Sequence, residues 1–414
     1  MSAIEPGRRA VITGVGVVSP NGVGASAFLE NCTAGVSGLK RYGHPGLRTS
    51  AVGAVGDDAF DPHDHLDAAD VRRTPRLVPM AVAAAREALQ QAGLDLAGQP
   101  DRVGVLLGTG GGGLEFVERQ YKAYFTGGKA SPFTITSGTH GNLSSELSIH
   151  LGAHGPSHVI TTGCASSTDA LGYARLLLAA GLADAFVVGG ADTTIAPGIL
   201  GGFEAMKVVS TRHWDDPAMN SRPFSADRDG FVLGEGAWMF VVEAAEAAEA
   251  RGARPLAELA GYGSTCDAFH RVQIAPDAKQ SVRAMQLALA DAQVRPEDVG
   301  YVNLHGTGTD MNDRMETAAV RQVFGPGADG IPMSSTKSLI GHPQGACGAA
   351  GVAATVLGMR AGRLHPTLNL THPDPACDLD YVPAMARDAT VRVALCNCIA
   401  FGSKNSALVV KAVT

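Results

Sequence analysis

The sequence predicts a layered α/β protein built from two related halves, and three observations support this expectation. Short runs of Val, Ile and Leu alternate with helix-like segments along the whole chain. No Pro/Ser-rich linker or block of charge divides it. Segments of the first half also recur, in the same order, in the second. We therefore expect an N-terminal half at residues 1–250 and a C-terminal half at residues 251–414.

A buried strand, RAVITGVGVV at residues 9–18, is the first element of the first half. An amphipathic helix at 81–94 precedes a second strand that ends in a Gly-rich segment, DRVGVLLGTGGGG at 101–113. Residues 157–181 read as a strand, a tight turn, a helix of small residues and a closing Gly, and residues 184–190 as a further strand. Because strands that alternate with helices are usually parallel, we expect mostly parallel sheets covered by helices.

The second half repeats this order. Its helix at 281–294 and the strand and Gly-rich exit at 297–310 match residues 81–113, and residues 331–362 match residues 157–181. The match predicts a pseudo-twofold axis between the halves. In that arrangement the loops that follow the strands of both halves can converge on one ligand site.

Composition excludes several classes of protein. The 414 residues are 45% hydrophobic and 18% charged, which suits a large core. The net charge of −7 argues against a nucleic-acid partner. The N-terminus lacks a signal-like apolar core, and the longest charge-free stretch, 338–359, contains His and Pro, so we expect a buried segment and no membrane span. The seven scattered cysteines indicate neither a disulfide framework nor a thiolate zinc site, so we expect no metal and a reducing, cytoplasmic location.

Cys164 is a candidate nucleophile, since it stands between a predicted strand and a predicted helix. The positive end of the helix and the unpaired amides of its first turn favour a thiolate. Gly163, Ala165 and Ser166 are small and leave room for a substrate. A buried thiol without a chemical role is the alternative, because Cys is among the most buried residue types.

His305 and His342 each follow a predicted strand of the second half, at exits related by the repeat to that of Cys164. A lone loop histidine is more often structural, whereas two at related exits favour a site. One Cys with two His allows acyl transfer to sulfur and then stabilisation of an enolate, because two imidazole N–H groups can hold one oxyanion. Lys337 and Glu316 are expected to form a charge pair that orients these groups, or else to be solvated.

Gly108, Gly110 and Gly113 match the G-x-G-x-x-G pattern of dinucleotide-binding loops. The acidic residue expected about twenty positions later is missing, since the sequence there reads GGKASPFTITSG. We therefore do not expect a nicotinamide cofactor. These glycines are interpreted as letting the backbone approach a substrate or a symmetry mate.

Five ordered motifs resemble those of the β-ketoacyl-acyl carrier protein synthases of the thiolase superfamily: TTGCASS, SRPFSADRDGFVLGEGA, HGTGTDMNDRMETAA, STKSLIGHPQGACGAAG and CDLDYVP. The similarity extends from Arg8 to the C-terminal NSALVVKAV. It implies a thiolase-like, five-layered αβαβα fold. It also implies a site made of Cys164, His305 and His342, with Lys337 and Glu316 in support.

The resemblance further implies a reaction in two stages. An acyl group moves from the phosphopantetheine of an acyl carrier protein to Cys164, its carbonyl oxygen held by the N–H groups of Cys164 and Phe401. Malonyl carrier protein then loses carbon dioxide while the two histidines stabilise its enolate, and the carbanion attacks the acyl-cysteine. Thr307 and Thr309 match the family's pantetheine contacts, and Phe401 its gating aromatic residue. The chain itself is expected to bind no cofactor, because phosphopantetheine arrives on the carrier protein.

The loop around Phe401 departs from the family. A pattern similar to FGFGGTN is replaced by IAFGSKN, in which Ser403 and Lys404 leave the backbone donor in place but bear on the motion of the gate. TTGCASSTDAL and CDLDYVP look more like discrete type II polyketide synthases. Their catalytic subunit often pairs with a homologous chain-length factor that lacks the nucleophilic Cys. Because Cys164 is present, the chain is identified as the catalytic subunit.

The expected partners are thus an acyl carrier protein and a Cys-less chain-length-factor homologue, or else a second copy of the chain. The segment 131–140 is expected to form an apolar strand edge near this interface. An acidic carrier protein is predicted to dock on basic residues, unless these are merely a solvated face: Arg72, Arg73, Arg76, Lys207 and Arg212. Two alternatives remain, a homodimeric fatty-acid elongation ketosynthase and a non-catalytic subunit that shapes a partner's pocket.

Overall fold

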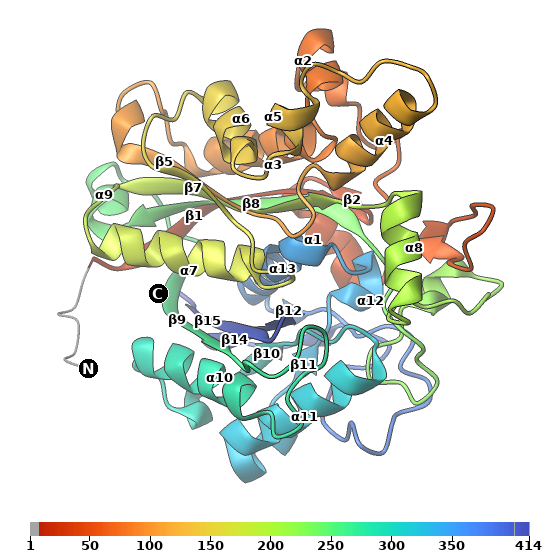
Figure 1. Ribbon diagram of the computed structural model, residues 1–414. Coiled ribbons are helices and arrows are strands. Elements are labelled where there is room, and N and C mark those ends of the chain that lie inside the picture. The colour runs from red at the N-terminus through yellow and green to blue at the C-terminus, as the bar shows by residue number, and fades with distance from the viewer. Residues whose placement is uncertain (1–7, 401, 414) are drawn as a thin grey trace.

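The computed structural model describes residues 8–400 and 402–413, which form five layers of alternating helices and sheets (Figure 1). One sheet has the strand order β6-β5-β7-β8-β1 and the other the order β11-β10-β14-β15-β9. A short pairing of β1 with β9 joins them. The strands of the first sheet are β1 (Ala10–Ser19), β5 (Val103–Gly108), β6 (Ser157–Ile160), β7 (Ala185–Thr193) and β8 (Glu235–Ala244). Those of the second are β9 (Ala257–Cys266), β10 (Tyr301–Asn303), β11 (Met333–Ser334), β14 (Val393–Ala400) and β15 (Lys404–Lys411).

The two sheets have the same pattern of strand pairing. β5 is parallel to β6 and β7, while β8 is antiparallel to β7 and β1. In the second sheet β10 is parallel to β11 and β14, while β15 is antiparallel to β14 and β9. This confirms the two pseudo-twofold-related halves; the boundary at residue 250 stays a prediction. The expectation of mostly parallel sheets is wrong for the inner strands. β14 and β15, for example, are separated by three residues, too few for the crossover that a parallel pair needs.

Helices form the outer and central layers (Figure 1). The first sheet is covered by α2 (Ala68–Arg73), α3 (Leu77–Ala92), α4 (Leu114–Phe125), α5 (Thr134–Gly138) and α6 (Asn142–Leu151). The second is covered by α10 (Lys279–Asp291) and α11 (Asp310–Phe324). Between the sheets lie α1 (Ala25–Ala34), α7 (Ser166–Ala179) and α13 (Cys347–Ala361), with α12 (Lys337–Ile340) before α13. Shorter elements complete the chain: β2 (Gly22–Val23), β3 (Lys40–Arg41), β4 (Ala51–Val52), α8 (Pro197–Ala205), α9 (Ala245–Ala250), β12 (Arg363–Leu364) and β13 (Arg387–Asp388).

The central helices α7 and α13 explain the small residues of the two repeated segments. A Cβ atom on Gly348 would lie 2.0 Å from Thr168 Oγ1, so the close approach of the helices requires glycine there. The charge-free segment 338–359 is buried within the protein, as expected. No helix in the described part of the chain combines the length and apolar character needed to cross a bilayer.

The expectation that residues 131–140 form a strand edge is wrong. The carbonyl of Ser131 accepts hydrogen bonds from both the N–H and the hydroxyl of Thr134, which starts a turn that continues as α5. The outer strand of this sheet is β6, the last strand in its order. The open edge of this sheet is therefore β6, and not the segment 131–140.

Candidate active site

Cys164 lies where β6 turns into α7, as the sequence predicts. Gly163 has a φ of 65°, a left-handed conformation that turns the chain sharply at the end of the strand. The carbonyl of Gly163 then accepts hydrogen bonds from the N–H and the hydroxyl of Ser166, the first residue of α7. The nucleophile candidate therefore stands at the N-terminal end of a 14-residue helix in the central layer. Its side chain is almost fully buried, with 3% exposed.

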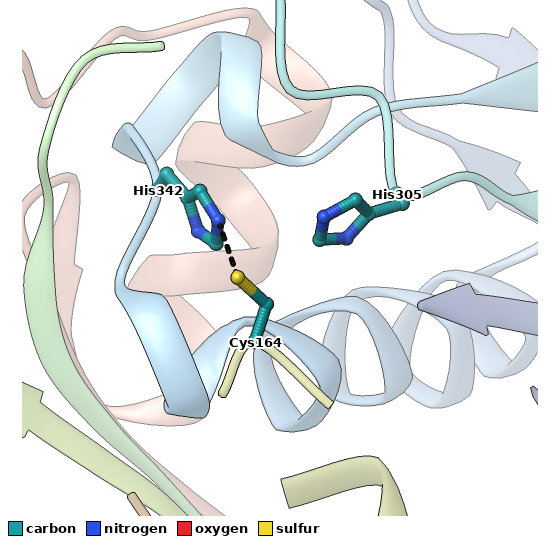
Figure 2. Close-up of side chains that lie close together, drawn as sticks. All are labelled: Cys164, His305 and His342. Atoms are coloured by element: carbon teal, nitrogen blue, oxygen red, sulfur yellow. Dashed lines mark hydrogen bonds between the residues drawn. The ribbon is translucent and has the colours of Figure 1, made fainter. Parts of the chain in front are cut away.

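His342 lies in direct contact with the thiol. Its Nε2 is 3.2 Å from Cys164 Sγ, as Figure 2 shows. The backbone of His342 is pinned on both sides, because its N–H donates to Val232 and its carbonyl accepts from Gly234. The ring of Phe231 packs edge-on against the imidazole at 5.1 Å between centroids. The histidine is thus held in position by the segment that follows the RPFSADRDG motif.

His305 completes the cluster from the end of β10 and points toward the other two side chains (Figure 2). The centroids of the two imidazoles lie 5.4 Å apart. Lys337 Nζ donates to the carbonyl of His305 at 2.6 Å and lies 3.3 Å from its Nδ1. Because an ammonium group can only donate, it faces an unprotonated Nδ1, and the single proton of the neutral ring is then on Nε2.

Glu316 supports His305 without touching Lys337. Its carboxylate accepts the backbone N–H groups of His305 and Gly306, both at 2.7 Å, and the side-chain amide of Asn397 at 2.8 Å. Glu316 and Lys337 are both buried, so the solvated alternative is wrong, and they form no ion pair within 4.0 Å, so the expected pair is wrong as a direct contact. The Lys337 charge nevertheless lowers the pKa of Glu316 across the site. Glu316 instead fixes the backbone of the turn, while Lys337 fixes the carbonyl and the ring.

Burial sets the protonation of both histidines. Burial and, to a smaller extent, the nearby Lys337 ammonium together lower the pKa of His305 to about 3. Burial also lowers the pKa of His342. Both rings are therefore neutral near pH 7 and can each donate one N–H group. Burial raises the pKa of Glu316 to about 7, against the opposing effect of the amides of Gly306 and His305.

A cavity of about 430 Å³ connects this cluster to the surface. Cys164, His305 and His342 lie among its lining residues, together with Thr307 and Thr309. The hydroxyls of these threonines are 2.9 Å apart. The structure thus brings together every candidate for acyl transfer and pantetheine contact except Phe401, which lies outside the described residues.

Comparison with known proteins decides the family. The model of the β-ketoacyl synthase N-terminal domain matches residues 7–248, and that of the C-terminal domain matches residues 256–371. The chain belongs to the β-ketoacyl synthase family. It is 39% identical to 3-oxoacyl-[acyl-carrier-protein] synthase 2 of Staphylococcus aureus over 98% of both chains. It is accordingly an acyltransferase of the ketosynthase type, with β-ketoacyl-acyl carrier protein synthase activity.

Solved structures confirm the thiolase-like ketosynthase fold. The ishigamide ketosynthase/chain length factor matches with a TM-score of 0.91 and 32% identity over 99% of this chain and all of that one. A type II polyketide synthase acyl-carrier protein in complex with its ketosynthase bound to the hexaketide matches with a TM-score of 0.89 and 31% identity over 98% of this chain and all of that one.

The five docking candidates of this ketosynthase have different surroundings. Lys207 is exposed and lines the cavity. Arg72 and Arg73 are exposed on α2, and Arg212 is exposed beside Trp214. Arg76 is committed to internal contacts, since it donates to the carbonyl of Val55 and pairs with Asp57 and Glu235. Lys207 has the placement at the cavity that docking requires, and Arg76 has the least freedom to reach a partner.

Asp192 is a structural residue of the site that sequence reasoning missed. Its buried carboxylate accepts the amides of Gly110 and Gly345 at 2.7 Å and that of Gly111 at 2.9 Å. It also accepts the hydroxyl of Thr109 at 2.8 Å. Amides of the glycine-rich loop therefore donate to an internal carboxylate. Through Gly345, three residues after His342, this carboxylate ties the two halves together.

Two further cysteines lie behind Cys164, and the sequence analysis assigned a role to neither of them. The thiols of Cys347 and Cys398 are 3.3 and 3.1 Å from the carbonyl oxygen of Cys164. Burial raises the pKa of Cys347, but the hydrogen bond from Cys398 and the Lys337 cation outweigh it and bring the pKa below its usual range. Cys164 lines the cavity, whereas these two thiols are absent from its described lining.

Proposed function

We propose that this chain catalyses decarboxylative condensation of malonyl carrier protein with an acyl chain bound to Cys164. The contact of 3.2 Å between Cys164 Sγ and His342 Nε2, inside a cavity that also receives His305, carries the proposal. In the first stage Cys164 sulfur forms a bond to the acyl carbon and gives up its thiol proton, the bond from the acyl carbon to the pantetheine sulfur breaks, and the pantetheine leaves as a thiol that carries this proton. The backbone N–H groups of Cys164 and Phe401 stabilise the oxyanion of this stage.

In the second stage malonyl carrier protein enters through the same cavity, where Thr307 and Thr309 contact its pantetheine arm. The bond to the carboxylate breaks, carbon dioxide leaves, and the electron pair moves onto the thioester oxygen. The neutral rings of His305 and His342 each donate an N–H group to this oxygen, which lowers the energy of the enolate. The enolate carbon then attacks the acyl carbon, and Cys164 sulfur leaves. The product is a β-ketoacyl thioester two carbons longer.

The roles of the supporting groups follow from their contacts. Lys337 keeps Nδ1 of His305 unprotonated, so that Nε2 carries the donated proton. Glu316 holds the turn of His305 and Gly306 in the position that aims the ring. Neither residue exchanges a proton with the substrate in this scheme. No cofactor bound by the chain is required, because phosphopantetheine is delivered on the carrier protein.

For the pathway, we infer type II polyketide biosynthesis, with this chain as the catalytic subunit and a Cys-less chain-length-factor homologue as its partner. The similarity to the ishigamide ketosynthase/chain length factor and to the hexaketide-bound ketosynthase supports this assignment. The outer strand β6 and the exposed apolar side chains of α4 and α5, such as Phe125 and Ile135, suit a large subunit interface.

Fatty-acid elongation by a homodimer is a second candidate. It is favoured by the 39% identity to 3-oxoacyl-[acyl-carrier-protein] synthase 2, against 31–32% for the polyketide ketosynthases. The two functions share the chemistry and differ in the partner. A non-catalytic role is disfavoured, because Cys164, His305 and His342 all meet in one cavity.

Reconstitution separates these candidates. The chain is combined with malonyl carrier protein and an acyl starter, with and without a co-expressed Cys-less homologue, and the products and assemblies are measured by mass spectrometry. The polyketide assignment predicts a heterodimer and a poly-β-keto product whose length changes with the partner's pocket residues. A fully active homodimer that releases a singly elongated product, indifferent to the partner, contradicts it and supports fatty-acid elongation.

A further inference from the structure

Beneath the nucleophile lies a cluster of three potential metal ligands. The ligand atoms of His305, Cys347 and Cys398 all lie within 4.8 Å of one another, and all three side chains are buried. The two sulfur atoms are 3.8 Å apart, and Cys398 Sγ is 3.5 Å from His305 Nδ1. Nothing in the condensation mechanism requires two extra thiols at this place.

These separations match the coordination shell of a tetrahedral zinc ion. With Zn–S bonds of about 2.3 Å and a Zn–N bond of about 2.05 Å, tetrahedral angles put two sulfur ligands about 3.8 Å apart and a sulfur and a nitrogen about 3.6 Å apart. The observed 3.8 and 3.5 Å are close to these values, and the third pair, Cys347 Sγ and the His305 ring nitrogen, lies within 4.8 Å. We propose that Cys347, Cys398 and Nδ1 of His305 form a binding site for a soft divalent cation of the zinc class.

The surroundings favour this chemistry in two ways. The ligands come from the start of α13, from β14 and from the loop after β10, which belong to the buried core and hold their positions. The Nδ1 lone pair of His305 is unprotonated, as a metal ligand requires. Lys337 would give up its contact of 3.3 Å to Nδ1, but it keeps the stronger hydrogen bond of 2.6 Å to the carbonyl of His305.

The charges also balance. Each thiol releases its proton to solvent as its S–metal bond forms, so two thiolates cancel the two positive charges of the cation. The buried site thereby gains no net charge beside the Lys337 ammonium group, which limits the cost of burial. The carbonyl oxygen of Cys164 lies 3.3 and 3.1 Å from the two sulfur atoms and is a candidate for the fourth ligand. The cation would thus lie directly behind the backbone of the nucleophile.

A second set of three ligand atoms competes for the same histidine. Cys164, His305 and His342 also lie within 4.8 Å of one another. The two sets differ in sulfur count, since the proposed site has two thiolates and the competing set has one. Alanine variants of the cysteines therefore identify which set binds.

The full-length protein, kept reduced with a non-chelating phosphine, is dialysed against Zn²⁺ and, separately, titrated with Co²⁺, whose visible spectrum reports tetrahedral thiolate ligation. We expect one bound ion per chain. Its affinity should be at least about 100-fold lower in Cys347→Ala and in Cys398→Ala, because loss of a residue that only orients a metal ligand already lowers metal affinity by about 10–100-fold. Cys164→Ala and the variant of the exposed Cys266, Cys266→Ser, should retain binding.

The reasoning is overturned if the wild-type protein binds no ion, if both alanine variants bind as the wild type does, or if Cys164→Ala abolishes binding, which would assign the ion to the competing set. Thermal unfolding of the metal-free proteins verifies that each variant is folded. Where an alanine variant fails to fold, the serine variant at the same position replaces it, because a hydroxyl keeps the hydrogen bond to the carbonyl of Cys164 but is a poor ligand for zinc.

Discussion

Replacement of Asp192 by Asn is expected to separate the glycine-rich loop from the turn after His342. Oδ1 of the carboxylate accepts hydrogen bonds from the hydroxyl of Thr109 and from the amides of Gly111 and Gly112. Oδ2 accepts hydrogen bonds from the amides of Gly110 and Gly345. The side-chain oxygen of the Asn will replace Oδ1, because three donors point at that position. The NH₂ group then replaces Oδ2 and faces the amides of Gly110 and Gly345, which are also donors, so these two amides lose their acceptor.

The cost follows from the two amides that lose their acceptor. A buried donor without a partner costs about 1–3 kcal/mol, so Asp192→Asn should lower the free energy of unfolding by roughly 2–6 kcal/mol. Because Gly345 is close to His342, decarboxylation of malonyl carrier protein should slow as well. The matched control is Asp298→Asn at an exposed ion pair with Arg295, for which a much smaller loss is expected because solvent screens the pair.

Urea unfolding followed by circular dichroism gives the stability of both variants, and carbon dioxide release from malonyl carrier protein gives the rate. The decisive comparison is between Asp192→Asn and the control. Burial raises the pKa of Asp192, so a protonated carboxyl is the competing account. If Asp192→Asn is as stable as the wild type, the carboxyl does not accept these amides as a charged group and the reasoning is refuted.

Three further predictions concern the histidines and the docking surface. His305→Ala or His342→Ala should slow malonyl decarboxylation by about 100–1000-fold while acyl transfer to Cys164 persists, and wild-type decarboxylation in both folded variants would refute the role of the rings as donors. Because burial lowers the pKa of His305 from 6.5 to about 3, the unfolded chain binds a proton below pH 6.5 that the folded chain does not. Stability should therefore fall from pH 6.5 toward pH 3 by up to about 1.4 kcal/mol per pH unit, less steeply in His305→Gln, and equal slopes in the two proteins would contradict this. Charge reversal at Arg72 and Arg73 should lower kcat/KM for carrier-protein substrates several-fold at low salt and little at high salt, and no change at low salt would move the docking face elsewhere.

The sequence predicted those parts of the fold that depend on local pattern. The internal repeat predicted that α3 corresponds to α10 and that the strand, turn and helix around Cys164 correspond to those around His342, since the spacing of apolar residues and glycines is a local property. Strand direction at the centre of the molecule is not local. The antiparallel inner strands were missed because alternation of strands and helices says nothing about a hairpin such as β14–β15.

In the active site, too, features that depend on local sequence pattern were predicted, and features that depend on contacts between distant segments were not. Cys164 and His305 were found because each closely follows a strand that the pattern identifies. His342 was found because its segment repeats that of Cys164, although α12 lies between β11 and His342, so its expected place at a strand exit is wrong. The contacts of Glu316 were predicted wrongly, because sequence separation does not reveal that its partners are the backbone amides of His305 and Gly306. Asp192 and the thiols of Cys347 and Cys398 carry no motif of their own. Only the approach of α13, β14 and the glycine-rich loop brings them to the nucleophile.

Acylation of Cys164 tests the central claim most directly. The protein is incubated with an acyl carrier thioester, and intact mass and peptide mapping locate the acyl group. We expect one acyl group per chain on the peptide that contains Cys164, and none on Cys164→Ala. Transfer to Cys347 or Cys398, or undiminished acylation of Cys164→Ala, would contradict the assignment of Cys164 as the nucleophile.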